Sequence, residues 1–136
     1  PDRKELTRVA SGFAQPNGIT GTPDGKTLYV ADINTNKLFR FDILPDGALT
    51  NRTLICEHGS DGMTMDEEGN LYLSAPGKFS GVTVVDKSGK EVELIDVPEH
   101  PANVCFGGKD RKTLFITART GLYSIQMRVK GANSAK

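Results

Sequence analysis

The stretch Gln15-Pro16-Asn17-Gly18-Ile19, followed closely by Pro23-Asp24-Gly25-Lys26-Thr27-Leu28-Tyr29-Val30-Ala31-Asp32, decides the fold of this chain. A tight polar corner opens the stretch, a short apolar strand follows, and an Asp-Gly turn leads into a second strand. The same order of corner, strand, turn and strand returns at 59–73 and at 101–116. The corner position in the three repeats is occupied by Asn17, Asp61 and Asn103.

The spacing between the repeats is nearly constant. Asp61 follows Asn17 by 44 residues, and Asn103 follows Asp61 by 42. Units of four strands that recur every ~40–45 residues are typical of β-propeller blades, whereas a β-sandwich of similar hairpins would not need a constant spacing. The sequence therefore predicts an all-β fold, a β-propeller of about three four-stranded blades.

The repeats also predict the domain boundaries. Residues 1–129 form one half propeller, and the small polar residues 130–136 form a frayed tail. The segment 37–43 alternates apolar and polar residues, as the third strand of a blade does. The third repeat lacks a fourth strand, and residues 4–10 have the spacing of one, so we expect 4–10 to be an outer strand of a neighbouring blade. The blade repeats lie near 15–56, 59–97 and 101–129.

Three blades cannot close into a ring, because propellers have about four to eight. Two explanations follow. Two chains could associate head to tail as a homodimer, each giving residues 4–10 to the last blade of the other, to complete a six-bladed ring. Alternatively, this chain is one half of a longer protein whose N-terminal half is missing.

The composition excludes several classes of partner. Lys plus Arg and Asp plus Glu both number 17, and this neutral balance argues against a nucleic-acid or membrane-surface partner, since both need a basic face. No apolar run approaches the ~20 residues of a membrane span. We expect a cytoplasmic location because no signal peptide is visible. The chain does not begin with methionine, however, so a trimmed start leaves a periplasmic location open.

The three corner residues are the candidates for chemistry. The corner before the first strand of a blade projects into the mouth of the central channel, so Asn17, Asp61 and Asn103 should all line it. Oxygen ligands that converge from several blades suit a hard divalent cation. Asp61 is the only carboxylate of the three, and beside a cation it could act as a general base. The alternative is that Asn and Asp before Gly simply suit tight turns.

The repeated motifs resemble those of the gluconolactonase, or senescence-marker-protein (regucalcin), family. The resemblance runs in order from Leu6 to Met127 and implies that this chain is the C-terminal half of a six-bladed propeller. The segments that carry it are 14–19, 23–32, Asp61-Gly62-Met63, 66–71, and Cys105-Phe106-Gly107-Gly108 with 113–117.

The resemblance implies a metal-dependent lactone hydrolase that opens a sugar or other small lactone with a cation-activated water. The family holds one divalent cation with a Glu, an Asn and an Asp; Asn17 matches the Asn, and Asp61 matches the Asp that also acts as the base. The cation is expected to be Ca²⁺ first, with Mg²⁺, Mn²⁺ or Zn²⁺ as alternatives, and Asn103 is a further channel-lining residue.

This sequence departs from the family pattern in one respect. The family's metal-binding Glu, and the Arg and Asn that contact the substrate, belong to the missing half and have no counterpart here. The alternative function is therefore a non-catalytic half propeller that dimerises and binds metal or a small ligand without turnover.

Overall fold

The computed structural model of the chain describes residues 5–75 and 81–133. Within these residues the polypeptide forms eleven β-strands that pair antiparallel in three sheets. No helix in this part of the chain is long and apolar enough to span a bilayer. The strands are β1 (Pro16–Gly21), β2 (Thr27–Asp32), β3 (Lys37–Ile43), β4 (Leu49–Cys56), β5 (Met63–Met65), β6 (Leu71–Ala75), β7 (Gly81–Val85), β8 (Glu91–Asp96), β9 (Pro101–Gly107), β10 (Thr113–Ala118) and β11 (Gly121–Gln126).

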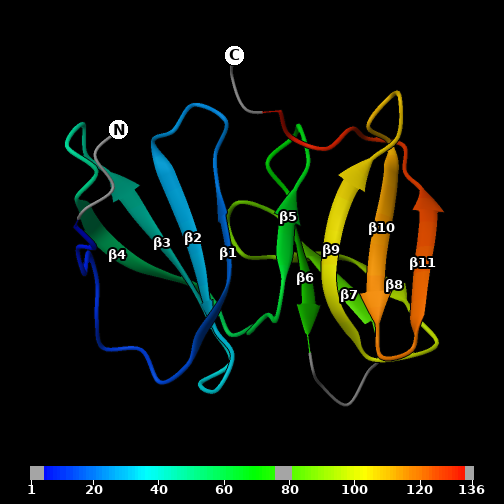
Figure 1. Cartoon of the computed structure of the whole chain (residues 1–136), viewed down its shortest axis with the longest axis horizontal. Helices are drawn as coiled ribbons and strands as arrows, with labels where there is room; N and C mark the ends of the chain where they lie inside the picture. Colours follow the sequence, from blue (N-terminus) through cyan, green and yellow to red (C-terminus); the bar gives the residue numbers. More distant parts are fainter. Residues whose placement is uncertain (1–4, 76–80, 134–136) are drawn as a thin grey trace.

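Each repeat of the sequence is one sheet, which we call a blade. The first blade has the order β1-β2-β3-β4, the second β5-β6-β7-β8, and the third β9-β10-β11. The first strands of the three blades, β1, β5 and β9, lie next to one another in the middle of the molecule and run in the same direction (Figure 1). This arrangement gathers the starts of the three repeats at one end of the molecule, as a propeller requires.

Short turns join the strands within a blade. The turn between β1 and β2 uses Gly25 at a φ of 70°, and the equivalent turn of the second blade uses Gly69 at 88°, a left-handed conformation that costs glycine little. The third blade places Arg111 at a φ of 57° in its corresponding turn. Arg111 adopts this conformation although it is not a glycine, and its side chain bonds to the C-terminal segment at Gly131.

Two apolar clusters hold the blades together, and the second blade contributes to both. Between the first and second blades lie Tyr29, Ala31, Leu38, Met63, Met65, Leu71, Leu73 and Val85. Between the second and third blades lie Tyr72, Val82, Val84, Ile95, Val97, Val104, Leu114, Ile116 and Ala118. Successive residues of a strand point to opposite faces, so all of β7 is buried.

The outward faces of the first and third blades are covered only in part. In β10, Leu114 and Ile116 are buried while Phe115 between them is exposed. In β1, Ile19 is 58% exposed, and in β11 Leu122 is 71% exposed. Large apolar side chains therefore lie on the outward faces of both end blades.

The strand predicted at 4–10 is absent from the described part of that segment. Residues 5–10 have no strand hydrogen bonds, and the side chain of Leu6 is fully exposed, while Lys4 lies outside the described residues. A strand forms by bonding to a neighbouring strand. Among the described residues the third blade has three strands, with β11 at its edge. The pairing of 4–10 with a neighbouring blade stays a prediction.

The prediction of a frayed tail from residue 130 was wrong for residues 130–132. The backbone N–H of Glu67 donates to Lys130 O at 2.8 Å, and that of Ala132 donates to Met65 O at 2.8 Å. The Arg111 guanidinium donates a hydrogen bond from Nη1 to Gly131 O at 2.8 Å. This segment therefore crosses to the end of β5 (Figure 1); its contacts are made by backbone atoms, which leave no pattern in the side chains. Residues 134–136 lie outside the described part.

Candidate functional site

The three corner residues meet at the start of the inner strands. The side-chain amide of Asn17 donates from Nδ2 to Oδ1 of Asp61 at 2.9 Å, from one blade to the next. Asn103 lies against Gly62, where a Cβ atom would overlap the Asn103 amide group. Asn17 and Asn103 are exposed and Asp61 is half-buried. One carboxylate and two amides from three blades thus share one polar surface.

Irregularities in strand pairing occur at two of the three corners. The β1–β2 pairing skips between Pro16 and Ile19, so Asn17 lies in a β-bulge. The β9–β10 pairing skips between Pro101 and Asn103, next to the third corner. Bulges bend a strand and redirect its side chains, and they are common beside active sites. Two of the three polar corners of the sequence therefore lie at local breaks in strand pairing.

A buried carboxylate anchors the chain that leads to Asn17. Asp32 is 2% exposed, and its two oxygens accept the backbone N–H groups of Ala14 at 2.7 Å and Gln15 at 3.0 Å. Burial raises the pKa of Asp32, but these bonds and one from Thr35 outweigh it, so the pKa lies below its ordinary value of 3.8. Asp32, the last residue of β2, thus fixes the backbone that precedes the first corner.

Two buried serines beneath the corners were missed by the sequence analysis. Ser60 and Ser74 are both fully buried. Ser60 O accepts the N–H of Gly18 in the first blade at 3.1 Å, and Ser74 O accepts the N–H of Asp61 at 2.8 Å. The only sequence signal is the position of Ser60 directly before a corner. A serine at the end of a strand is too common to single out Ser74.

The side-chain oxygens of Asn17 and Asp61 fit a hard divalent cation in chemical type, whereas Asn103 Oδ1 accepts the backbone N–H of Val104 at 2.9 Å. Within the described residues, Asn17 Oδ1 and Asp61 Oδ2 accept no hydrogen bond, and carboxylate and amide oxygens are the ligands that Ca²⁺ prefers. The set is small, since the described residues contain no group of three or more His, Cys, Asp or Glu side chains placed to hold a metal ion. Other ligands would have to come from water or a second polypeptide.

The buried carboxylate of Asp66 is not a further ligand candidate. Its oxygens accept hydrogen bonds from the backbone N–H groups of Glu68 and Asn70, from the Asn70 amide and, at 3.1 Å, from the Tyr72 hydroxyl. Burial, followed by the charge of Asp66, raises the pKa of Tyr72 well above its usual range. Asp66 closes a turn and has its lone pairs occupied.

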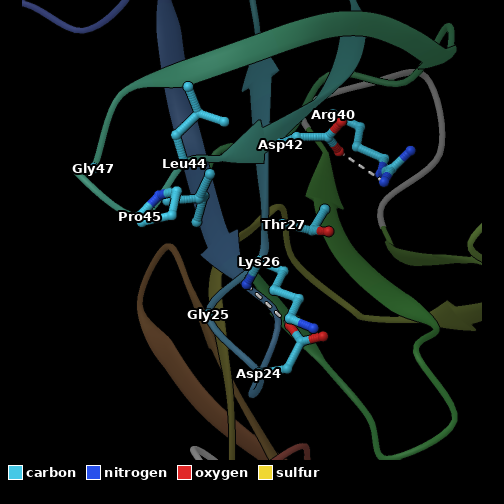
Figure 2. A pocket seen from close by; sticks show the side chains of 10 residues that line it. Asp24, Gly25, Lys26, Thr27, Arg40, Asp42, Leu44, Pro45 and Gly47 are labelled. Atoms are coloured by element: carbon cyan, nitrogen blue, oxygen red, sulfur yellow. Dashed lines mark hydrogen bonds and ion pairs between the residues drawn. The ribbon is translucent and has the colours of Figure 1, made fainter.

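A surface depression of about 790 Å³ lies against the first blade, away from the corners. Figure 2 shows its walls, which come from the turn at 24–27 and from the segment 40–47. Within the wall, Arg40 Nη2 forms an ion pair with Asp42 Oδ1 at 2.9 Å, and the Asp24 carboxylate accepts the backbone N–H of Lys26 at 3.0 Å. The depression includes none of the three corner residues, so it is separate from the candidate site.

Comparison with known proteins identifies the family. The SMP-30/gluconolactonase/LRE-like region matches residues 1–120. The chain belongs to this family. It is 32% identical to a gluconolactonase of Zymomonas mobilis, over 96% of this chain and 40% of that protein. It is also 31% identical to the pentonolactonase of Haloferax volcanii, over 85% and 42%, and 32% identical to regucalcin of Sus scrofa, over 78% and 38%.

Solved structures agree with the fold. A gluconolactonase of Xanthomonas campestris superposes with a TM-score of 0.80 at 30% identity, over 93% of this chain and 42% of that one. Regucalcin of Agrobacterium tumefaciens, titled a calcium-binding protein, has a TM-score of 0.82 at 23% identity, over 96% and 52%, and shows the fold alone. The predicted family and propeller fold are confirmed, and the family includes lactone hydrolases. The chain spans about half or less of the length of these relatives.

Proposed function

We propose that this chain supplies part of a cation-dependent site that hydrolyses a lactone. Asn17 and Asp61 are ligands of one divalent cation, Asp61 is also the general base, and Asn103 lines the channel beside them. The observation that carries the proposal is the 2.9 Å hydrogen bond between Asn17 and Asp61. It joins an amide and a carboxylate whose other oxygens accept no hydrogen bond from the described residues.

The chemistry assigned to each residue follows from its functional group. A divalent cation bound at the corner would polarise the lactone carbonyl and lower the pKa of a neighbouring water. Asp61 accepts a proton from the attacking water as the new C–O bond forms at the carbonyl carbon. The ring C–O bond then breaks, the departing oxygen takes up a proton, and the product is a hydroxy acid. Asn17 orients Asp61 through its amide hydrogen bond.

The proposed cation is Ca²⁺, with Mg²⁺, Mn²⁺ or Zn²⁺ as alternatives. Ca²⁺ ranks first because the corner offers only oxygen donors, whereas Zn²⁺ is held mainly by nitrogen and sulfur ligands. The proposed substrate is a sugar lactone or another small lactone. This choice rests on the names of the relatives, which include a gluconolactonase and a pentonolactonase.

The proposed partner is a second three-bladed half, either another copy of this chain or the N-terminal half of a longer protein. Support comes from the outward faces of the end blades, which expose Ile19 and Leu122. It also comes from β11, which among the described strands has a neighbour on one side only. An exposed strand edge favours pairing with another chain. Sedimentation equilibrium should give the mass of two chains; a stable, soluble monomer would contradict self-association and leave the second alternative.

A non-catalytic role is the second candidate function. It is favoured by the small ligand set, because Asp61 is the one carboxylate among the three corner residues and the described residues form no larger cluster of metal-binding side chains. In this role the half propeller binds a cation or a small ligand, and turnover needs groups from elsewhere. Cation binding without lactone hydrolysis would distinguish it from the first proposal.

The deciding experiment measures glucono-δ-lactone hydrolysis after chelation and after adding back Ca²⁺, Mg²⁺, Mn²⁺ or Zn²⁺. The wild type is compared with Asp61→Ala and with a control, Asp46→Ala, which alters an exposed turn carboxylate. We expect hydrolysis to require a cation and to fall by at least a hundredfold in Asp61→Ala, with no change in Asp46→Ala. A rate that depends on neither the cation nor Asp61 would overturn the catalytic proposal.

A further inference from the structure

The hydroxyl group of Ser74 bridges two blades directly beneath the corner residues. Ser74 is the penultimate residue of β6 in the second blade and is fully buried. Its Oγ accepts the backbone N–H of Gly62 at 2.9 Å and lies 2.7 Å from Gly62 O and 2.9 Å from Ala102 O in the third blade. A hydroxyl has one proton, so Ser74 donates to one of these two carbonyl groups at a time.

Ser60 extends the bridge to the first blade. It is also fully buried, and its Oγ lies 2.7 Å from Gly62 O. Its carbonyl oxygen accepts the N–H of Gly18 at 3.1 Å. The groups that the two serines bind belong to the immediate sequence neighbours of the three corner residues, which are Gly18 beside Asn17, Gly62 beside Asp61, and Ala102 beside Asn103.

The repeat structure shows that a hydroxyl at this position is not required by the blade. The equivalent residue of the first blade, three positions after Leu28, is Ala31, which is also fully buried. Alanine therefore satisfies the packing between blades. At Ser74 the hydroxyl has a specific task, because among the described residues the N–H of Gly62 has no other acceptor. An unpaired buried N–H is costly.

We propose that Ser74 is a positioning residue for the cation site. Its hydroxyl fixes the Asp61-Gly62 corner of the second blade relative to the Asn103 corner of the third blade, and so keeps Asp61 in place to bind the cation together with Asn17. The separation between the Asp61-Gly62 corner and Asn103 allows little change, because the Asn103 amide lies where a Cβ of residue 62 would be. The inference rests on the proposed function for the identity of the ligand, which is a divalent cation.

The test compares wild type with Ser74→Ala and with Thr83→Val. Thr83 is a buried hydroxyl residue of β7 in the same blade and lies outside the serine bridge. Titration calorimetry with Ca²⁺ alone should show a Kd about tenfold higher in Ser74→Ala, a typical loss when a group that orients metal ligands is removed. Thr83→Val should bind Ca²⁺ like the wild type.

A second readout does not depend on the cation. In NMR spectra of the cation-free protein, the side-chain amide signals of Asn17 and Asn103 should shift in Ser74→Ala and stay in place in Thr83→Val. If these signals and the Kd are unchanged while only thermal stability falls, Ser74 has a structural role and the proposal is overturned.

The two proposals fail in different ways. If the wild type binds no divalent cation, the proposed function fails, while the amide signals still report whether Ser74 positions the corners. If Ser74→Ala does not fold, Ser74→Cys keeps the side-chain volume and weakens the hydrogen bonds, and it should raise the Kd and shift the same two amide signals. Unchanged values in Ser74→Cys would count against the positioning role.

Discussion

Asn17 Nδ2 and Asp61 Oδ1 lie 2.9 Å apart although their residues are separated by 44 positions in the chain. The two residues occupy equivalent positions in successive blades, and adjacent blades place these equivalent positions side by side. Gly18 makes this approach possible, since its backbone bonds to Ser60 and a Cβ there would lie 3.1 Å from Ser60 O. Corner residues that repeat along the sequence therefore lie close together in the fold.

Gly62→Ala should disturb the third corner. The new methyl group would occupy the place of the Asn103 amide, so Asn103 must move, and we expect a loss of about 1–3 kcal/mol in the free energy of unfolding. Gly21→Ala is the control, because its Cβ would meet only Thr27 O at an ordinary 3.5 Å. Urea unfolding of both variants measures the difference; equal stabilities would show that Asn103 has room to spare.

Asp66→Ala should be among the most destabilising changes of a turn residue. It removes the acceptor for the backbone N–H of Glu68, for two groups of Asn70 and for the buried Tyr72 hydroxyl, and we expect a loss of about 3 kcal/mol or more.

The exposed turn residue Asp110 is the matched control for Asp66. Its carboxylate accepts the N–H of Lys112 at 3.1 Å, so Asp110→Ala should cost about 1 kcal/mol or less. Tyr72→Phe, which removes one bond to Asp66, should fall between the two. Equal losses in Asp66→Ala and Asp110→Ala would refute the role of burial.

Asp32 should make the fold sensitive to acid. Its pKa is lower in the folded chain than its ordinary value of 3.8, so the unfolded chain binds its proton first as the pH falls. The stabilisation is complete above the ordinary value and is lost as the pH falls towards the folded pKa. Unfolding measured between pH 7 and pH 2 should therefore show the stabilities of wild type and Asp32→Asn converging in acid. A constant difference would contradict this linkage.

Arg52→Ala should release the segment that precedes the first blade. The guanidinium lies 4.2 Å from the ring centre of Phe13 and 4.1 Å from that of Phe39, and it donates to Ser11 O at 2.9 Å. Hydrogen exchange of residues 11–15 should become faster in Arg52→Ala. Arg52→Lys should restore little protection, because lysine keeps the charge but lacks the planar fork. Unchanged exchange in both variants would show that other contacts hold the segment.

The blades were predictable because strand alternation and turn residues repeat in the sequence. The segment 37–43 alternates, and β3 has these same bounds. The meeting of Asn17 with Asp61 also followed from counting repeats, since equivalent corners of adjacent blades must be neighbours. The chemical roles of both residues stay predictions, because a spacing specifies where a side chain lies and does not specify what it binds.

The contacts that cross between blades were not predictable in the same way. Ser74 reaches Ala102 in another sheet, and a serine at a strand end has no pattern that reports such a partner. Residues 130–132 bind through backbone atoms, which every residue possesses. The stack of Arg52 on Phe13 joins residues that no periodicity relates. Periodicity describes each blade well, but it carries little information on how neighbouring blades bond.

The burial of both faces of the second blade has a consequence for cooperativity. Both apolar clusters contain its side chains, for example Leu71 in one and Val82 in the other. A repeat that cannot bury its faces alone depends on its neighbours. Opening the second blade therefore exposes the inner faces of all three at once, and the described chain should melt as a single two-state unit, with no stable intermediate in which the first and third blades persist alone.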